Sequence, residues 1–141
     1  MPRLALLNMI VGFVIISLAA AFGTFLATDM TEMFVHDPAA LSNWQTTLQQ
    51  SAHGHSNLFG MLHIVFGLTM PYSVLNNRIK SLQTMGLFMG VMAMGPGMLI
   101  RANQIPNNEF DLTGVVIGIL LSACFAAICM HIFGLTRKFM K

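Results

Sequence analysis

Three of the five histidines lie within eleven residues, at His53, His55 and His63, and the last of them is inside an apolar stretch. Imidazole nitrogens bind haem iron, copper and zinc, so this cluster indicates a metal or haem site. Asn57 lies between these histidines and is more typical of a side chain that orients a ligand than of a ligand itself. Motifs for Ser/His/Asp catalysis, phosphate loops and helical HExxH zinc sites are absent from the sequence.

Helical periodicity places the polar and small residues of this region on one face. At 100° per residue they occupy about 120° of arc, and the remaining positions are apolar. The face consists of His53, Ser56, Asn57, Gly60, His63 and Gly67. His55 points to the opposite side if the helix already holds there. Lipid offers a polar stripe no hydrogen-bond partners, so the stripe indicates a functional site.

Spacing limits what these side chains can bind together. His53 and His63 are about 12–15 Å apart along one helix, too far for both to be axial ligands of one iron. A haem at His53 is therefore five-coordinate or takes its second ligand from another helix or subunit. His53 and His55 can converge on a compact metal ion only if the chain before the helix is extended. His63 fits a pocket residue or a core histidine equally well, and Arg101 fits either an interface residue or the partner of a haem propionate.

The composition predicts a membrane protein. Charged residues make up 9% of the 141 residues and apolar residues 55%, which does not suit a water-soluble surface. Four apolar runs reach the length of about 20 residues that a bilayer requires. We predict an all-α integral membrane protein with a single domain, an up-down bundle of four transmembrane helices at about 4–28, 54–75, 82–102 and 112–136. The net charge of +2 does not indicate a nucleic-acid partner.

Several breaks are expected along the chain. We predict an acidic loop over 29–52, broken at Asp37-Pro38, with a short amphipathic helix opening near Trp44. Pro71 lies near the end of the second span. Gly95-Pro96-Gly97 predicts a kink or a broken turn inside the third span, because proline removes a helical donor. Gly86 and Gly90 lie four residues apart on that span and predict a close-packing surface.

The basic residues predict the orientation of the bundle. Arg3, the 78–80 loop and the 137–141 tail all fall on one side, and the acidic loops fall on the other. The positive-inside rule then places both termini in the cytoplasm, in a bacterial inner membrane. His53 and His55 lie at the outer end of the second span under this topology.

The run from Ala52-His53 to Gly60-Met61, with Pro71 and a basic turn after it, resembles the styrene oxide isomerase family. Members of that family are small four-span membrane proteins that assemble as trimers and hold haem b at the subunit interface. The resemblance implies that His53 ligates the haem, and that ferric iron acts as a Lewis acid towards an epoxide oxygen. This chain departs from the family at Phe59, where the family has asparagine, and in the third span, where Met, Gly, Pro and Ile replace substrate-positioning side chains.

A weaker similarity involves the pattern His-x-His-x-Asn-x-x-Gly that begins at His53. It resembles a motif of small proteins related to the catalytic subunit of haem–copper oxidases. Both resemblances imply haem.

The sequence leads to one principal hypothesis and two rivals. The principal hypothesis is a lipid-embedded homotrimer that binds haem b through His53, with His55 as the fallback ligand, and acts on a small apolar molecule such as an epoxide. The first rival is a non-enzymatic haem or copper protein, an accessory or electron-transfer subunit of a membrane complex. The methionine-rich third span and the outward histidines fit copper. The second rival is a purely structural subunit.

Overall fold

The computed structural model describes residues 1–106 and 111–140, and these residues form helices and short connections without a strand. The all-α class predicted from the sequence is therefore confirmed for this part of the chain. The helices are α1 (Arg3–His36), α2 (Trp44–Thr69), α3 (Asn77–Met92), α4 (Met98–Ala102) and α5 (Leu112–Phe139). Three short segments complete the order, the 3₁₀ turns η1 (Pro38–Ser42) and η2 (Met70–Tyr72) and the π-helical turn η3 (Ala93–Gly97).

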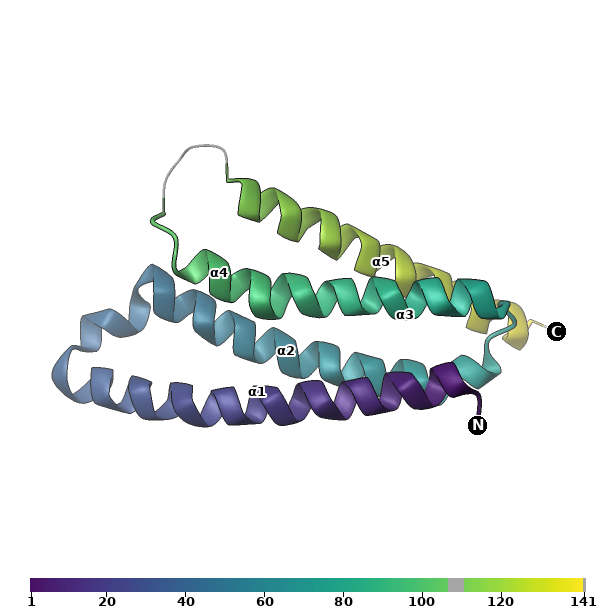
Figure 1. Ribbon diagram of the computed structural model, residues 1–141, viewed down its shortest axis with the longest axis horizontal. Helices are drawn as coiled ribbons and strands as arrows, with labels where there is room; N and C mark the ends of the chain where they lie inside the picture. Colours follow the sequence, from purple (N-terminus) through teal and green to yellow (C-terminus); the bar gives the residue numbers. More distant parts are fainter. Residues whose placement is uncertain (107–110, 141) are drawn as a thin grey trace.

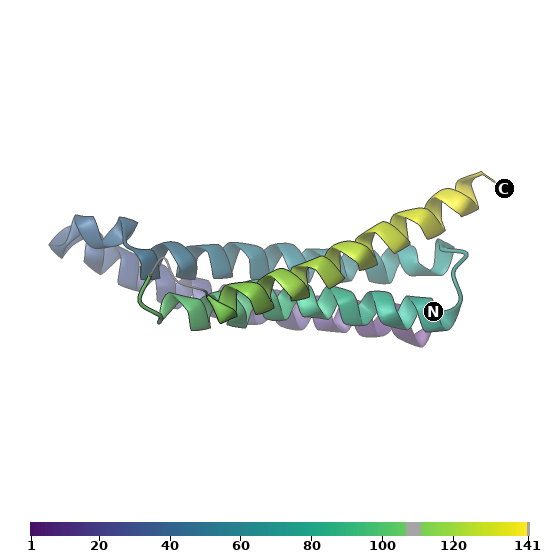
Figure 2. The same ribbon diagram turned by 90° about the horizontal axis from the view of Figure 1, so that it is seen from above.

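The long helices run up and down beside one another, and both termini lie at the same end of the molecule (Figure 1). Helix α1 packs most extensively on α2, and α3 packs most extensively on α5. Helix α4 continues the line of α3 after the π-helical turn, so the two act as one rod (Figures 1 and 2). Figure 2 shows that α5 crosses this rod at an angle.

Glycines set how closely the paired helices approach. A Cβ atom on Gly12 of α1 would lie 2.5 Å from the carbonyl oxygen of Gly60 on α2. A Cβ atom on Gly86 would lie 2.7 Å from that of Ala127 on α5, and one on Gly90 would lie 2.6 Å from the sulfur of Cys124. No larger residue fits at these crossings, so the close-packing surface predicted at Gly86 and Gly90 is confirmed.

The segment predicted as a loop over 29–52 is mostly helical. The loop prediction was wrong over 29–36, which belong to α1, whereas the predicted opening of a helix near Trp44 is confirmed. Helix α1 continues to His36 and stops there, as the Asp37-Pro38 break requires. Helix α2 begins at Trp44 because the side chain of Asn43 accepts a hydrogen bond from the backbone N–H of Thr46 at 2.8 Å. This cap extends the helix of the second predicted span by about ten residues at its N-terminal end, so His53 lies well inside α2.

Two prolines shape the other helices. Pro96 has no N–H to donate to the carbonyl of Met92, and the chain widens into the π-helical turn η3 at this point. The predicted broken turn in the third span is therefore confirmed. Pro71 is the second residue of η2, which follows directly after Thr69, the last residue of α2, so the helix stops before the predicted boundary at 75.

Within the described residues, three helical stretches are long and apolar enough to cross a membrane. They are α1, the stretch Asn77–Ala102 and α5. Helix α2 is not among them because its first half is polar. The bundle also reverses the usual distribution of a soluble protein, since Asn8, His63 and Gln83 are completely buried whereas many large apolar side chains face outward. This arrangement is that of an integral membrane protein.

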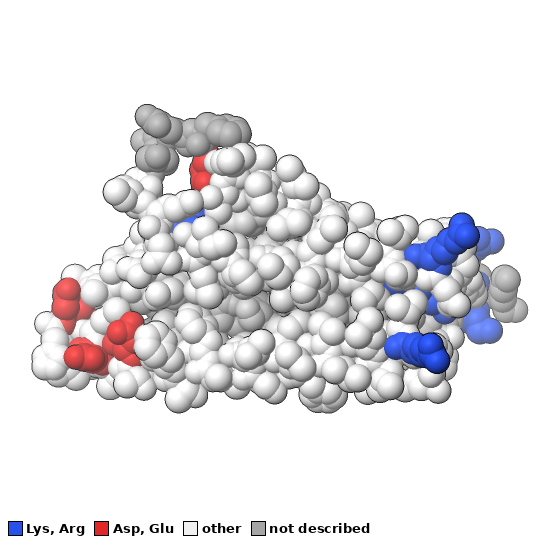
Figure 3. Space-filling model, viewed as in Figure 1, with Lys and Arg blue, Asp and Glu red and all other residues white. Residues whose placement is uncertain are grey.

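The two ends of the bundle carry opposite charges (Figure 3). Basic side chains gather at the end that holds both termini, where α1 and α3 begin and α5 ends (Arg3, Arg78, Lys80, Arg137, Lys138). Acidic side chains gather at the far end of α1 (Asp29, Glu32, Asp37). The predicted separation of charge is therefore confirmed for the described residues apart from Arg101, which lies away from the basic end and is paired with Asp111.

Candidate functional site

His53 lies on the face of α2 that packs against α1. Its Nδ1–H donates to the carbonyl oxygen of Ala19 at 3.1 Å. Because a carbonyl oxygen can only accept, this contact places the proton on Nδ1 and leaves the lone pair of neutral imidazole on Nε2. The ring lies directly against Gly23, where an added Cβ would collide with Cε1 and would lie 3.0 Å from Nδ1. Helix α1 therefore provides both the orienting hydrogen bond and the space for the ring.

An open groove runs along α1 beside His53. Small residues line it, namely Ala20, Gly23, Thr24, Ala27, Thr28 and Thr31. Each of the three threonine hydroxyls donates its proton to the backbone carbonyl one turn earlier, so the hydroxyls of this lining can act as acceptors only. The amide nitrogen of Asn57 donates to the carbonyl of His53 at 3.2 Å and lies 3.4 Å from Nε2. Asn57 therefore borders the free nitrogen of His53 and has only a long contact with it.

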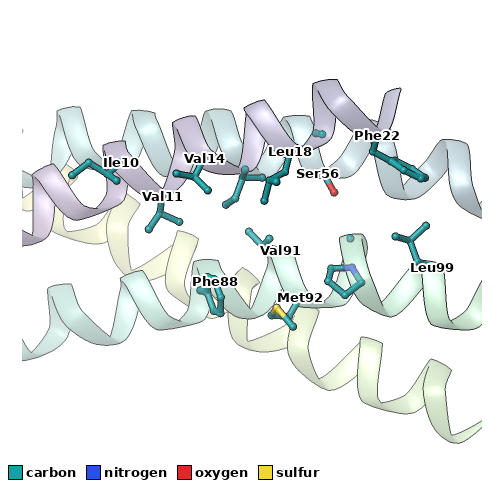
Figure 4. Close-up of a pocket in the computed structure, with 14 residues that line it drawn as sticks. Ile10, Val11, Val14, Leu18, Phe22, Ser56, Phe88, Val91, Met92 and Leu99 are labelled. Carbon is teal, nitrogen blue, oxygen red and sulfur yellow. The ribbon is translucent and has the colours of Figure 1, made fainter. Parts of the chain in front are cut away.

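A second cavity of about 460 Å³ lies between α1 and α3, and its lining is almost entirely apolar (Figure 4). Ser56 contributes the single hydroxyl of this lining, and Figure 4 shows its oxygen pointing into the cavity. Ala19 and Phe22 line the cavity and also contact His53, since the imidazole and phenyl centroids are 6.4 Å apart. We call this space the apolar cavity; it ends beside the imidazole that is the leading ligand candidate.

His55 is directed elsewhere. Its Nδ1–H donates to the carbonyl of Ser51 on its own helix at 2.8 Å. Because α2 is helical from Trp44 onward, His53 and His55 lie about 200° apart around the axis. The extended turn on which a shared metal ion depends is therefore not present. Among residues 1–106 and 111–140, no group of three or more His, Cys, Asp or Glu side chains could hold a metal ion.

Arg101 lies on α4 and is engaged within its own chain. Its guanidinium lies 2.7 Å from a carboxylate oxygen of Asp111 and 5.3 Å from the centre of the Trp44 ring. Helix α4 packs on the face of α2 that carries Ala52, whereas His53 faces α1. The predicted partnership of Arg101 with a haem propionate stays a prediction.

His63 belongs to a different polar cluster from His53. It is completely buried, and its Nδ1–H donates to the side-chain oxygen of Asn8 at 2.9 Å. Asn8 in turn donates to the hydroxyl of Thr84 on α3 at 2.8 Å. The two histidines therefore lie in different surroundings, with His53 at the open groove and His63 in the closed core.

Sequence reasoning missed most of this second cluster. His131 on α5 is buried, and its ring stacks on Phe66 of α2 with centroids 4.1 Å apart. Gln83 on α3 is also completely buried. A signal was present, because Asn8, Gln83 and His131 each lie a few residues inside a basic residue that marks the membrane boundary.

Comparisons with models of protein families, with curated proteins and with solved structures found no significant match to this chain.

Proposed function

We propose that this protein is a haem b-binding integral membrane protein in which Nε2 of His53 ligates the iron at the groove on α1. The observation that supports this most directly is the contact between Gly23 and the imidazole. Only a residue without a side chain allows the ring to lie there, and the Ala19 carbonyl then fixes which nitrogen is free. Such an orienting hydrogen bond from the second nitrogen is typical of ligating histidines.

The surroundings fit a flat apolar macrocycle. The groove is lined by small residues, which allow close approach by a second helix, and it opens to the outside of the chain. We therefore propose that a neighbouring copy covers it in a homotrimer, as the resemblance to styrene oxide isomerases implies. Bound ferric haem would supply a Lewis-acidic iron. His53 would hold it, and Asn57, which lies 3.4 Å from Nε2, would border it on the side of α2.

The apolar cavity suits a small apolar molecule that enters from the lipid. Its lining excludes water, and Ser56 can donate one hydrogen bond to an oxygen of that molecule. Isomerisation of an epoxide to a carbonyl compound is a fitting reaction class. One carbon–oxygen bond breaks, a hydrogen moves with its electron pair from the carbon that keeps the oxygen to the carbon that lost it, and a carbon–oxygen double bond forms. All of this happens within a single molecule, so no oxidant, reductant or redox partner is required.

We further propose that α2 is a fourth span and that both termini lie in the cytoplasm of a bacterial inner membrane. Helices α1 and α3 begin at the same basic end, so a chain that crosses in α1 must return before it crosses again in α3 (Figure 1). The second half of α2 also exposes an apolar stripe at helical spacing, formed by Leu58, Met61, Val65 and Leu68. The basic end is the cytoplasmic one by the positive-inside rule.

An absorption spectrum with a pyridine haemochrome assay tests the proposal. We expect the purified protein in detergent to show a Soret band with about one haem b per chain, and His53→Ala to lose it. His55→Ala is the matched control, since that side chain bonds only to its own helical turn, and we expect it to keep the band. A band that persists in His53→Ala would refute the ligand assignment.

The copper, electron-transfer and structural hypotheses predict other results for the same purified protein. A colourless preparation with stoichiometric copper would replace the haem proposal by a copper-handling role. A haem protein that does not isomerise an aryl epoxide without reductant, but exchanges electrons with a membrane partner, would be an accessory or electron-transfer subunit. A preparation with neither cofactor would support a structural subunit.

A further inference from the structure

Buried polar side chains form a second layer in the half of the bundle nearer the basic end. The positions of this layer follow from how α2, α3 and α5 pack one layer further from that end. Gly90 on α3 contacts Phe59 on α2 and Cys124 on α5. Seven residues towards the basic end make about two helical turns, or roughly 10 Å, so the same faces meet again there. This step leads from Gly90 to Gln83 on α3. On α2 and α5, which run opposite to α3, it leads to Phe66 and His131. The stacking of Phe66 on His131 at 4.1 Å confirms this register between α2 and α5, and the hydrogen bond from Asn8 to Thr84, next to Gln83, places that part of α3 beside the partner of His63.

Hydrogen bonds fix the tautomer of neutral His63 in this layer. The side-chain nitrogen of Asn8 donates to the carbonyl of Leu4 at 2.9 Å, so its oxygen faces His63 and accepts from Nδ1–H. Asn8 also donates to Thr84, whose own hydroxyl proton goes to the carbonyl of Lys80. The Asn8 side chain is thereby fully engaged, and the lone pair of His63 is on Nε2.

The same logic fixes neutral His131. The hydroxyl of Thr69 donates to the carbonyl of Val65 at 2.7 Å, so it can only accept from Nε2–H of His131 at 2.8 Å. The lone pair of His131 is therefore on Nδ1. Two imidazoles from different helices each present an unprotonated nitrogen to the interior of the bundle.

These two nitrogens and the amide of Gln83 lack partners. Among the described residues, His63 Nε2, His131 Nδ1 and both side-chain atoms of Gln83 are buried and form no hydrogen bond. His63 and Gln83 are completely inaccessible, and His131 is 4% exposed. Buried polar groups of native proteins are nearly always hydrogen-bonded, to ordered water where no protein group is in reach.

We propose that this layer is a binding site for ordered water between α2, α3 and α5. Water has the complementary chemistry, because it can donate to His63 Nε2 and to His131 Nδ1 and accept from the amide N–H of Gln83. The hydrogen bonds to Asn8 and Thr69 hold the two imidazoles in the tautomers that need such a donor. The site is separate from the haem proposal, since His63 lies about 15 Å along α2 from His53.

Solid-state NMR of the protein in lipid bilayers tests this inference, with ¹⁵N-labelled histidine and glutamine and magnetisation transferred from water. We expect His63 protonated at Nδ1, His131 protonated at Nε2, and water contacts at the other nitrogen of each ring and at the Gln83 amide. Gln83→Leu should remove the water contacts. Gln50→Leu is the matched control, because it makes the same substitution at an exposed glutamine outside the layer, and the water contacts of His63, His131 and Gln83 should persist in it.

The result that overturns the inference is equally specific. Direct coupling between the Gln83 amide and either histidine nitrogen, without a water contact, would show a network of protein groups alone. If none of the His63, His131 and Gln83 side chains received magnetisation from water, the layer would hold no water. Both results come from the unmodified protein, so the test stands even if Gln83→Leu fails to fold.

Discussion

Replacing Gly23 with alanine should weaken haem binding at His53 while leaving the bundle folded. The added methyl group would collide with Cε1 of the imidazole and lie 3.0 Å from Nδ1 and 3.1 Å from Nε2. The ring would have to swing away from α1. In doing so it would give up the 3.1 Å hydrogen bond to the Ala19 carbonyl, which orients it.

The size of the effect follows from the role of that hydrogen bond. Loss of an orienting partner typically lowers metal affinity by about 10–100-fold. This corresponds to about 1.4–2.8 kcal/mol of binding free energy, at about 1.4 kcal/mol for each factor of ten. Gly54→Ala is the matched control, because Gly54 follows His53 directly and a Cβ there would meet nothing within 4 Å.

Haemin titration of the apo-protein in detergent, followed at the Soret band, measures the effect, and thermal unfolding of each variant reports on the fold. We expect Gly23→Ala to bind more weakly than Gly54→Ala at similar Tm. Equal affinities for the two variants and the parent would show that the ring does not depend on its place against α1. An equal loss in both would indicate a general sensitivity of the crossing rather than contact with Gly23.

Three further substitutions test the packing and the cavity. Asn8→Leu leaves the hydrogen-bonding groups of His63 and Thr84 without their partner, and it should lower the free energy of unfolding by about 1–3 kcal/mol for each group, measured by denaturant titration. Gly12→Val should lower the free energy of unfolding by about 1–3 kcal/mol, because the larger side chain overpacks the crossing of α1 and α2. Gly118→Val, where a Cβ meets nothing within 4 Å, is the control and should change the free energy of unfolding by about 0.5 kcal/mol or less. Equal losses of stability in the two variants would contradict the close crossing at Gly12. Ser56→Ala should weaken binding of an apolar epoxide by about 2–12-fold, the equivalent of one hydrogen bond, in a direct binding assay.

Much of the fold was readable from local signals in the sequence. Proline at 96 and the doublet Asp37-Pro38 act on the backbone itself, so their effects appear where they were predicted. A helix was also predicted to open near Trp44, where α2 begins, but the length of α1 and the continuity of α2 from Trp44 into the second span were not readable in this way. A helix that extends beyond its apolar run has no hydropathy signal there, so its full length does not follow from that run.

The residues of the candidate site could be predicted from the sequence, but their division between an open groove and a closed core could not. Periodicity correctly placed His53, Asn57 and His63 on one face of a helix, and it placed His55 on the opposite face. It could not show that Ala19 and Gly23 of another helix receive His53, because a pairing between helices is a tertiary property. Nor could it show that Gln83 is completely buried.

The three clustered histidines differ in a way that decides which of them can bind a large cofactor. A haem ligand needs one ring nitrogen fixed by the protein and the other open to a space as large as a macrocycle. His55 is fixed by its own helical turn and turns away from the groove, and His63 is fixed by Asn8 but sealed in the core. His53 alone of the three is fixed by a neighbouring helix beside an open groove. The same stripe on α2 can therefore serve two purposes, an outer half that receives a cofactor and an inner half that holds the bundle together.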